Sequence, residues 1–168
     1  MRVDLLSIPY DSGMRGARMG AGPDALLAAG LASRLTASGH EVSDTAIELP
    51  ESGFFPEVQA AFALDRSLAR TVSACIARGA FPMVLSGNCI SCIGTVGGIG
   101  DPALGAIWFD AHGDFNTPET TRSGFLDGMS LGTLTGRCWR ALAGNHSVHC
   151  RNVSRACRSA HGIRPRTG

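Results

Sequence analysis

The chain has 168 residues, of which 44% are apolar, and a formal net charge of +1. This length is enough for one domain with a sizeable core. A charge near zero argues against a nucleic-acid-binding protein, and no apolar run approaches the ~20 residues that cross a membrane. Asp4 interrupts the apolar stretch at the N-terminus, so a secretory signal is not expected. We therefore expect a cytoplasmic protein whose cysteines are reduced thiols or metal ligands.

Charge is distributed unevenly along the chain. Residues 1–144 carry 10 Arg and 14 acidic residues, whereas residues 145–168 carry 5 Arg and no acidic residue. The second segment has neither the periodicity of a helix nor that of a strand. It also lacks aromatic residues that could stack on bases, so it does not predict nucleic-acid binding. We expect a partial α/β domain over residues 1–144 and an irregular, disordered basic tail over residues 145–168.

Apolar runs alternate with helical periodicity through the first 140 residues. The predicted elements, in chain order, are a strand at 3–9, a helix at 23–37, a strand at 41–49, a helix at 56–78, a strand at 81–85, a short helix ending near 98, a strand at 104–109 and a helix at 129–135. This alternation predicts a parallel sheet covered by helices on both faces, a three-layer αβα architecture. In such sheets, functional sites form at the carboxyl ends of the strands.

Three polar side chains follow the predicted strand at 104–109. Asp110, His112 and Asp114 are spaced two residues apart, and alternate residues of a strand point the same way. Two carboxylates and one imidazole are suitable ligands for Mn²⁺, Fe²⁺ or Zn²⁺. Cys89 follows the neighbouring strand at 81–85, so we expect its thiol to lie at the same edge of the sheet. The sequence thus predicts a metal site with these four residues as candidate ligands.

Other interpretations of these residues stay open. The acids of a strand-end loop can instead cap the next element, and a buried cysteine usually only packs. Cys89 and Cys92 also form a C-x-x-C pair, which suggests a zinc or thiol-redox module completed from the tail. The tail residues in question are His146, His149, Cys150, Cys157 and His161. More than fifty residues separate the two groups and the second has no regular spacing, so this interpretation is disfavoured.

Three motifs resemble the ureohydrolase family of arginases, agmatinases and formimidoylglutamases. The sequence D-A-H-G-D at Asp110–Asp114 is similar to the family's D-A-H-x-D metal motif. Residues Asn116–Ser130 resemble a loop that in arginases includes N-T-P and S-G-N-L-H-G-M, and residues 20–23 resemble the family's G-P opening. The resemblance spans roughly residues 1–140. It implies an arginase-like three-layer fold that is incomplete on its C-terminal side.

The resemblance also implies an activity. Ureohydrolases hydrolyse guanidino and amidine groups with a hydroxide activated at a binuclear Mn²⁺ centre. The expected substrate here is arginine or a modified arginine such as hydroxyarginine, and the expected product is urea or a urea derivative. The expected partner is this small guanidino molecule, with no membrane or nucleic acid involved. Because family members usually form trimers or hexamers, a homo-oligomer is also expected.

Residue by residue, the resemblance assigns roles to the predicted site. Asp110, His112 and Asp114 become metal ligands, and Cys89 stands where the family has a metal-binding His. Asn116 and Ser123 match positions that hold the amino acid end of the substrate. Asp127 stands where arginases have a His credited with proton shuttling and is the expected catalytic residue. Phe125 replaces an Asn, which should alter substrate recognition.

The family's second metal motif, a D-x-D pair on a later strand, has no counterpart here. The last acidic residue of the chain is Asp127. We therefore expect one bound metal ion or none, and the activity of this chain is left open. The alternatives to a hydrolase are a non-catalytic remnant that binds one metal or a partner chain, and the less favoured zinc module.

Overall fold

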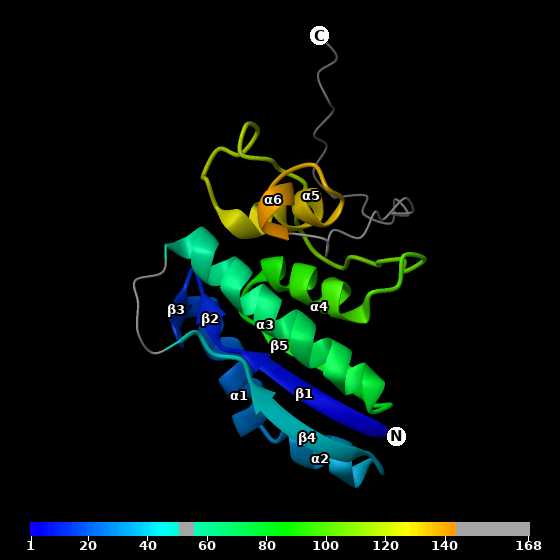
Figure 1. Ribbon diagram of the computed structural model, residues 1–168. Coiled ribbons are helices and arrows are strands. Elements are labelled where there is room, and N and C mark those ends of the chain that lie inside the picture. The colour runs from blue at the N-terminus through cyan, green and yellow to red at the C-terminus, as the bar shows by residue number, and fades with distance from the viewer. Residues whose placement is uncertain (51–55, 144–168) are drawn as a thin grey trace.

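A three-stranded parallel sheet forms the centre of the molecule (Figure 1). The computed structural model describes residues 1–50 and 56–143, so the predicted tail at 145–168 and the domain boundary before it lie outside the described residues. Strand β1 (Arg2–Ile8) lies between β4 (Glu41–Ala46) and β5 (Phe81–Ser86), and both pairings are parallel. Every residue of β1 after its first is buried. Burial of successive residues, which point to opposite faces, is typical of a strand covered on both faces.

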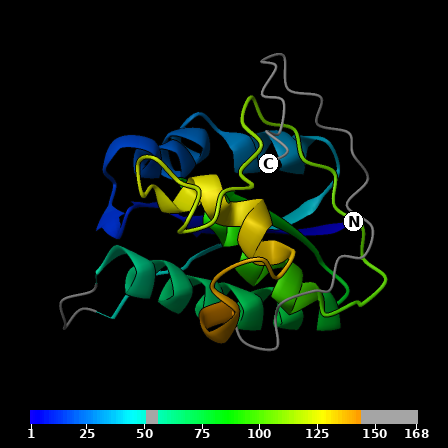
Figure 2. The same ribbon diagram turned by 90° about the horizontal axis from the view of Figure 1, so that it is seen from above.

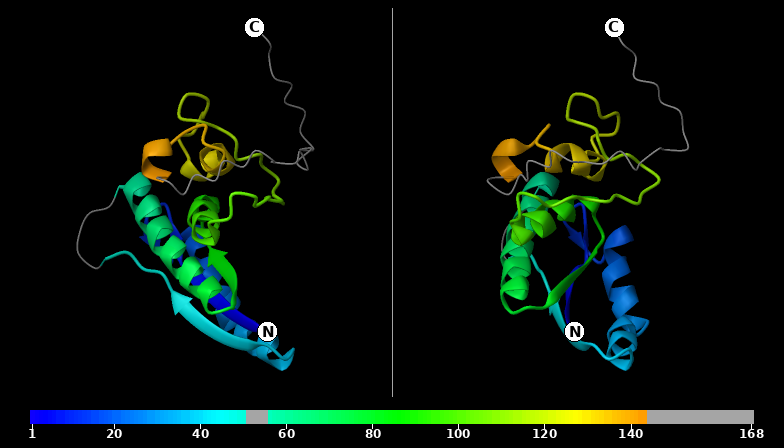
Figure 3. Two further views of the ribbon diagram at one scale, coloured as in Figure 1. Left: turned by 45° about the vertical axis from the view of Figure 1, so that its right-hand side comes forward. Right: turned by 90° about the vertical axis from the view of Figure 1, so that its right-hand side faces the viewer.

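Helices cover both faces of this sheet, as the two turned views show (Figures 2 and 3). One face carries α1 (Gly22–Ala28) and α2 (Leu31–Ala37), and the other carries α3 (Glu57–Ala77) and α4 (Cys92–Ile99). The α/β class, the parallel sheet and the three-layer arrangement are therefore confirmed. The predicted helix at 56–78 is also confirmed, and the predicted helix after β5 corresponds to α4.

The single helix predicted at 23–37 is wrong. Gly30 adopts a φ of +85° and separates α1 from α2. This left-handed conformation is open to glycine at little cost and ends one helix before the next begins. The apolar periodicity on either side of Gly30 is helical, which is why the two short helices resembled one longer helix in the sequence.

The strand predicted at 104–109 is also wrong. No strand is assigned to these residues, and they follow an irregular path outside the sheet (Figure 1). Leu104 and Trp108 instead pack against an apolar cluster formed by helices, while Ile107 and Phe109 are 72% and 93% exposed. A short apolar run has the composition of a buried strand, but a strand also requires a partner for its backbone groups. Within the described residues, the outer edge of β5 provides no such pairing.

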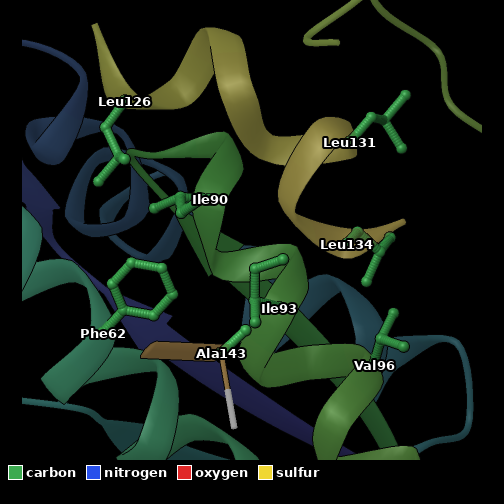
Figure 4. Packing of buried hydrophobic residues seen from close by; sticks show 8 residues of the cluster. All are labelled: Phe62, Ile90, Ile93, Val96, Leu126, Leu131, Leu134 and Ala143. Atoms are coloured by element: carbon green, nitrogen blue, oxygen red, sulfur yellow. The ribbon is translucent and has the colours of Figure 1, made fainter. Parts of the chain in front are cut away.

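The apolar cluster packs the second half of the described chain onto α3 (Figure 4). Its buried members are Phe62, Ile90, Ile93, Val96, Leu126, Leu131, Leu134 and Ala143. They come from α3, the short 3₁₀ helix η2 (Cys89–Ser91), α4, the 3₁₀ helix η3 (Leu126–Met129), α5 (Ser130–Leu134) and α6 (Arg140–Ala143). Helix α5 confirms the helix predicted at 129–135. The cluster thereby fixes the 126–134 segment above the carboxyl end of the sheet.

Helices α3 and α4 approach closely because two glycines of α4 face α3. A Cβ on Gly94 would lie 2.5 Å from the backbone oxygen of Asp65, and one on Gly98 would lie 2.5 Å from that of Ala69. A methyl group at either position would force the helices apart. The glycine-rich composition of α4 is therefore a packing requirement.

Two smaller features complete the described fold. A two-stranded antiparallel pair, β2 (Tyr10–Asp11) and β3 (Met14–Arg15), follows β1 and leads into the 3₁₀ helix η1 (Arg18–Ala21). The sequence analysis did not predict this hairpin. Among the described helices, none combines the length and apolar character needed to cross a membrane.

Asp65 is a buried acid in the α3–α4 interface, only 4% exposed. Its Oδ1 accepts a hydrogen bond from the backbone N–H of Gly94 (3.3 Å), and its Oδ2 has no hydrogen-bond partner among the described residues. Burial raises the pKa of this carboxyl well above its usual range. The folded state therefore holds a proton on Asp65 at pH values where the unfolded chain has released it.

We predict that Asp65→Asn makes the protein relatively more stable as pH rises. Below the pKa of Asp65 in the unfolded chain, the folded and unfolded states both carry the proton. Above that pKa only the unfolded state ionises, so the wild type loses stability as pH rises, until the pKa of Asp65 in the folded protein is reached. The variant has no such loss. Its free energy of unfolding in urea, relative to wild type, should rise by about 1 kcal/mol or more between pH 4 and pH 8.

Asp4 provides a control of opposite sign. Hydrogen bonds from Ser43 and Arg78 lower the pKa of this carboxyl. Its contribution to stability is present at neutral pH and is lost as pH falls through the lowered pKa. Asp4→Asn should therefore be less stable than wild type at pH 7, with the difference shrinking in acid. A pH-independent difference for Asp65→Asn would contradict the assignment of Asp65 as a buried, proton-holding acid.

Candidate metal centre

Three potential metal ligands meet beyond the carboxyl end of β5. The Sγ of Cys89 and one carboxylate oxygen each from Asp110 and Asp114 lie within 4.8 Å of one another. The Sγ of Cys89 lies 3.9 Å from Oδ2 of Asp110. Cys89 begins η2 directly after the turn that follows β5, and the two acids belong to the irregular loop after residue 109. The structure thus brings together three of the four ligands predicted from the sequence.

Asp114 is the most buried of the three, with 7% of its surface exposed. Its Oδ2 is buried and has no hydrogen-bond partner among the described residues, and its backbone φ is +45°. Burial and the neighbouring charge of Asp110 raise the pKa of this carboxyl. A buried carboxylate oxygen without a donor beside a second carboxylate is the arrangement that a cation would stabilise.

The surroundings of the Cys89 thiol, like those of Asp114, disfavour negative charge. Burial, followed by the charges of Asp127, Asp114 and Asp110, raises its pKa to about 12. A bound divalent cation reverses this effect, because a coordinating thiol is deprotonated. One thiolate and two carboxylates fit a single Zn²⁺, Fe²⁺ or Co²⁺ ion, and the sulfur shifts the preference away from Mn²⁺. The described ligands do not fit two ions.

His112 contacts Asp110 but is not in the group of three ligand atoms that lie within 4.8 Å of one another. Its side chain is 83% exposed, and its Nδ1 lies 3.2 Å from Oδ1 of Asp110. The expectation that it points with Asp110 and Asp114 assumed a strand through residue 109, and the loop that replaces the strand does not preserve the alternation. Its role as a metal ligand stays a prediction.

The predicted substrate-binding residues lie on the exposed loop that follows the ligands. Asn116 is exposed and its backbone N–H donates to the carbonyl of Gly128 (3.0 Å). Ser123 is exposed and its Oγ accepts a hydrogen bond from the N–H of Phe125 (3.2 Å). The roles assigned to both residues stay predictions. The interaction with the Gly128 carbonyl ties the start of this loop to η3.

Asp127, the predicted catalytic residue, is 4% exposed. Its Oδ2 accepts a hydrogen bond from Nδ2 of Asn88 (2.7 Å), and its Oδ1 accepts one from the backbone N–H of Ile90 (3.1 Å). Burial raises the pKa of this carboxyl, and these hydrogen bonds counteract the shift. A catalytic role for Asp127 stays a prediction, but both of its oxygens already have partners inside the protein.

Asn88 is a site residue that the sequence analysis missed. It contacts Asp127 and also the N-terminal hairpin, where the backbone N–H of Ser12 donates to its Oδ1 (3.1 Å). The sequence held a partial signal for it, because Asn88 directly precedes Cys89. Cys89 and Asp127 both stand where the resemblance has a His, and Asn88 adjoins the first in sequence and contacts the second in the structure.

The zinc module considered in the sequence analysis receives no geometric support from the described residues. Cys92 is not in the group of neighbouring ligand atoms and packs against the apolar cluster. The histidines and cysteines at 146–161 lie outside the described residues.

The fold and site together define a class of protein. A parallel α/β sheet with carboxylates and a thiol gathered beyond its carboxyl edge is typical of a metal-binding α/β protein of the kind that positions catalytic ions there. Comparison with known proteins specifies the family. The family model described as "Arginase family" matches residues 1–161, and the chain belongs to this family.

The similar proteins are bacterial arginases. The chain is 34% identical to the arginase of Bacillus caldovelox over 145 residues, which is 80% of this chain and 48% of that protein. The solved arginase structure of Bacillus caldovelox matches with a TM-score of 0.77 at 30% identity, covering 87% of this chain and 52% of that chain. The solved arginase structure of Bacillus subtilis matches with a TM-score of 0.75 at 33% identity, covering 85% of this chain and 50% of that chain. The chain thus spans about half the length of the relatives it matches.

Metal binding can be tested ligand by ligand. Cys89→Ala and Asp114→Asn each remove one of three grouped ligand atoms and should weaken Co²⁺ or Zn²⁺ binding at least about tenfold. His112→Ala, at the exposed side chain, should change the affinity by less than about threefold. Isothermal titration calorimetry of the full chain gives all three values. A loss with His112→Ala as large as that with Asp114→Asn would mean that the ligand set is the one predicted from the sequence.

Proposed function

We propose that this protein is a metal-dependent hydrolase of the guanidino group of arginine or a modified arginine, releasing urea or a urea derivative. The observation that carries the proposal is the convergence of Cys89, Asp110 and Asp114 in a chain of the arginase family. The matched relatives carry the name arginase, which supports the substrate class. The proposal takes Mn²⁺ as the family's metal, with Zn²⁺, Fe²⁺ or Co²⁺ as the alternatives that the Cys89 thiolate favours. It also includes a cytoplasmic location and a homo-oligomeric state.

The site residues have distinct parts in this proposal. A guanidinium carbon is a poor electrophile, and a bound divalent ion would lower the pKa of water enough to supply hydroxide at neutral pH. Asp110, Asp114 and Cys89 would hold that ion and balance its charge. Asn116 and Ser123 would bind the amino acid end of the substrate, on the loop directly after the ligands. The exposed Phe125 borders the same loop, so it would influence which guanidino compound is accepted.

A second candidate function is metal binding without turnover. The observation that favours it is the size of the ligand group, because the described residues bring together three ligand atoms. Three protein ligands can hold one ion with an open position, whereas the binuclear chemistry expected from the resemblance needs more.

A urea-release assay separates the two candidates. The full chain, loaded with Mn²⁺ or with Co²⁺, should release urea from arginine or hydroxyurea from hydroxyarginine, and Asp114→Asn should reduce the rate at least about a hundredfold. Ser123→Ala should mainly raise KM, because this residue is proposed to bind the end of the substrate remote from the chemistry.

The controls decide the outcome. Arg122→Ala, a variant of an exposed residue in the same loop without a proposed role, should retain activity. Stoichiometric metal binding with no urea from any guanidino substrate tested would reject the hydrolase and support the second candidate. Urea release that persists in Asp114→Asn would reject this site as its source.

A further inference from the structure

The turn that carries Cys89 is enclosed by two segments distant in sequence. On one side, a Cβ added at Gly87 would collide with the backbone of Tyr10 and lie 2.7 Å from the Cα of Gly20. On the other side lies the 3₁₀ helix η3, which contributes Asp127. Asn88 stands between these segments and directly precedes Cys89. The position of the thiol therefore depends on what holds this turn in place.

The surroundings of Asn88 determine the orientation of its side-chain amide. Its Oδ1 accepts from the backbone N–H of Ser12 (3.1 Å), and its Nδ2 faces the carboxylates of Asp127 (2.7 Å) and Asp11 (3.5 Å). Rotating the amide by half a turn would place a donor against a donor and an oxygen between two carboxylates. Only an amide satisfies both sides, because it combines one acceptor with two donor hydrogens.

The carboxylate of Asp11 is fixed independently. It is 1% exposed and forms a two-point ion pair with Arg18, whose Nε and Nη2 lie 3.0 and 3.1 Å from its two oxygens. The Oγ of Ser12 donates to the same group (3.1 Å). Arginine–carboxylate pairs of this geometry are the strongest and most directional that proteins make. The hairpin therefore presents Asn88 with a rigid partner.

Asp127 connects this network to the residues that flank the thiol. One of its oxygens holds Asn88, and the other accepts from the N–H of Ile90, so Asp127 binds the residues on either side of Cys89. Its own backbone oxygen accepts from the Oγ of Ser130 (2.7 Å), the first residue of α5. With both carboxylate oxygens engaged and 4% of its surface exposed, Asp127 has little capacity to exchange a proton with substrate.

We propose that Asn88 and Asp127 form a positioning pair that holds the thiol of Cys89 beside Asp110 and Asp114, and that Asp127 has this role in place of the proton transfer expected from the sequence. Asp127 acts through Asn88 and Ile90, and Asn88 acts through its covalent neighbour. Asn88 is half-buried and Asp127 is buried, and the pair lies between the Asp11–Arg18 ion pair and η3.

The test measures how fast iodoacetamide alkylates Cys89 in the metal-free full chain, with peptide mass spectrometry to separate it from the other cysteines. Asn88→Asp places a carboxylate between two others and should release the turn. Because the added charge also lowers the thiolate fraction of Cys89, rates are compared per thiolate from their pH dependence, and the per-thiolate rate of Cys89 should rise by roughly tenfold. Adding Asp127→Asn restores a donor–acceptor pair and should recover most of that change. Asp101→Asn, an exposed acid in another loop, is the matched control and should have no effect.

The buried thiols of Cys75 and Cys138 report on the fold as a whole. Equal acceleration at all three cysteines, no acceleration at Cys89, or no recovery in the double variant would each overturn the proposal. If Asn88→Asp does not fold, Asn88→Ala removes the same donor without adding charge, and the same criteria apply. Co²⁺ binding provides a second readout, because a displaced thiol weakens the sulfur-to-cobalt absorption band.

The positioning role rests on the proposed function, because the thiol is held in place for metal binding. The alkylation test does not depend on that function. Alkylation is measured without metal and without turnover. A failure of the urea assay with a confirmed Cys89 effect would reject the hydrolase alone, whereas unchanged alkylation would reject the positioning pair alone.

Discussion

The parallel pairing of β1 with β5 is the constraint on which the described site depends. The register places Ile8 opposite Ser86, so the segments that follow the two strands leave the sheet at the same edge. Asn88 consequently lies within hydrogen-bond distance of Ser12 and Asp11, although 76 and 77 positions separate it from them in the sequence. The pairing is stable because β1 is buried on both faces, where an unpaired backbone group would be costly.

Beyond that edge, the main physical problem is an excess of negative charge. Asp11, Asp114 and Asp127 are all buried there, and each is stabilised differently. Asp11 is paired with Arg18, and Asp127 accepts hydrogen bonds from an amide and a backbone N–H. Asp114 has an oxygen with no donor among the described residues. The carboxylate with an oxygen left without a donor is therefore the one that lies beside Cys89 and Asp110, where a cation would bind.

Comparison of sequence and structure shows which patterns were informative. The helix at 56–78 was predictable because it buries side chains at helical spacing, and the strand at 81–85 because it is a short apolar run between turn residues. Gly30 separates α1 from α2 through its positive φ, but the sequence does not show which glycine within a helical pattern adopts a positive φ. The run at 104–109 is apolar like a buried strand, yet strand formation depends on a neighbouring backbone that no local pattern contains. That error also explains why His112 was expected beside Asp114.

The sequence by itself determined the α/β class, the membership suggested by its motifs, and the identity of residues able to bind a metal. These properties reside in local periodicity and in the chemistry of individual side chains. Only the tertiary structure decided that Cys89 joins Asp110 and Asp114, that His112 stays exposed and contacts only Asp110 of the three, and that Asn88 holds Asp127. Such contacts join loops whose paths are set by packing against distant elements, and hydrogen bonding depends on a few tenths of an ångström that sequence spacing does not encode.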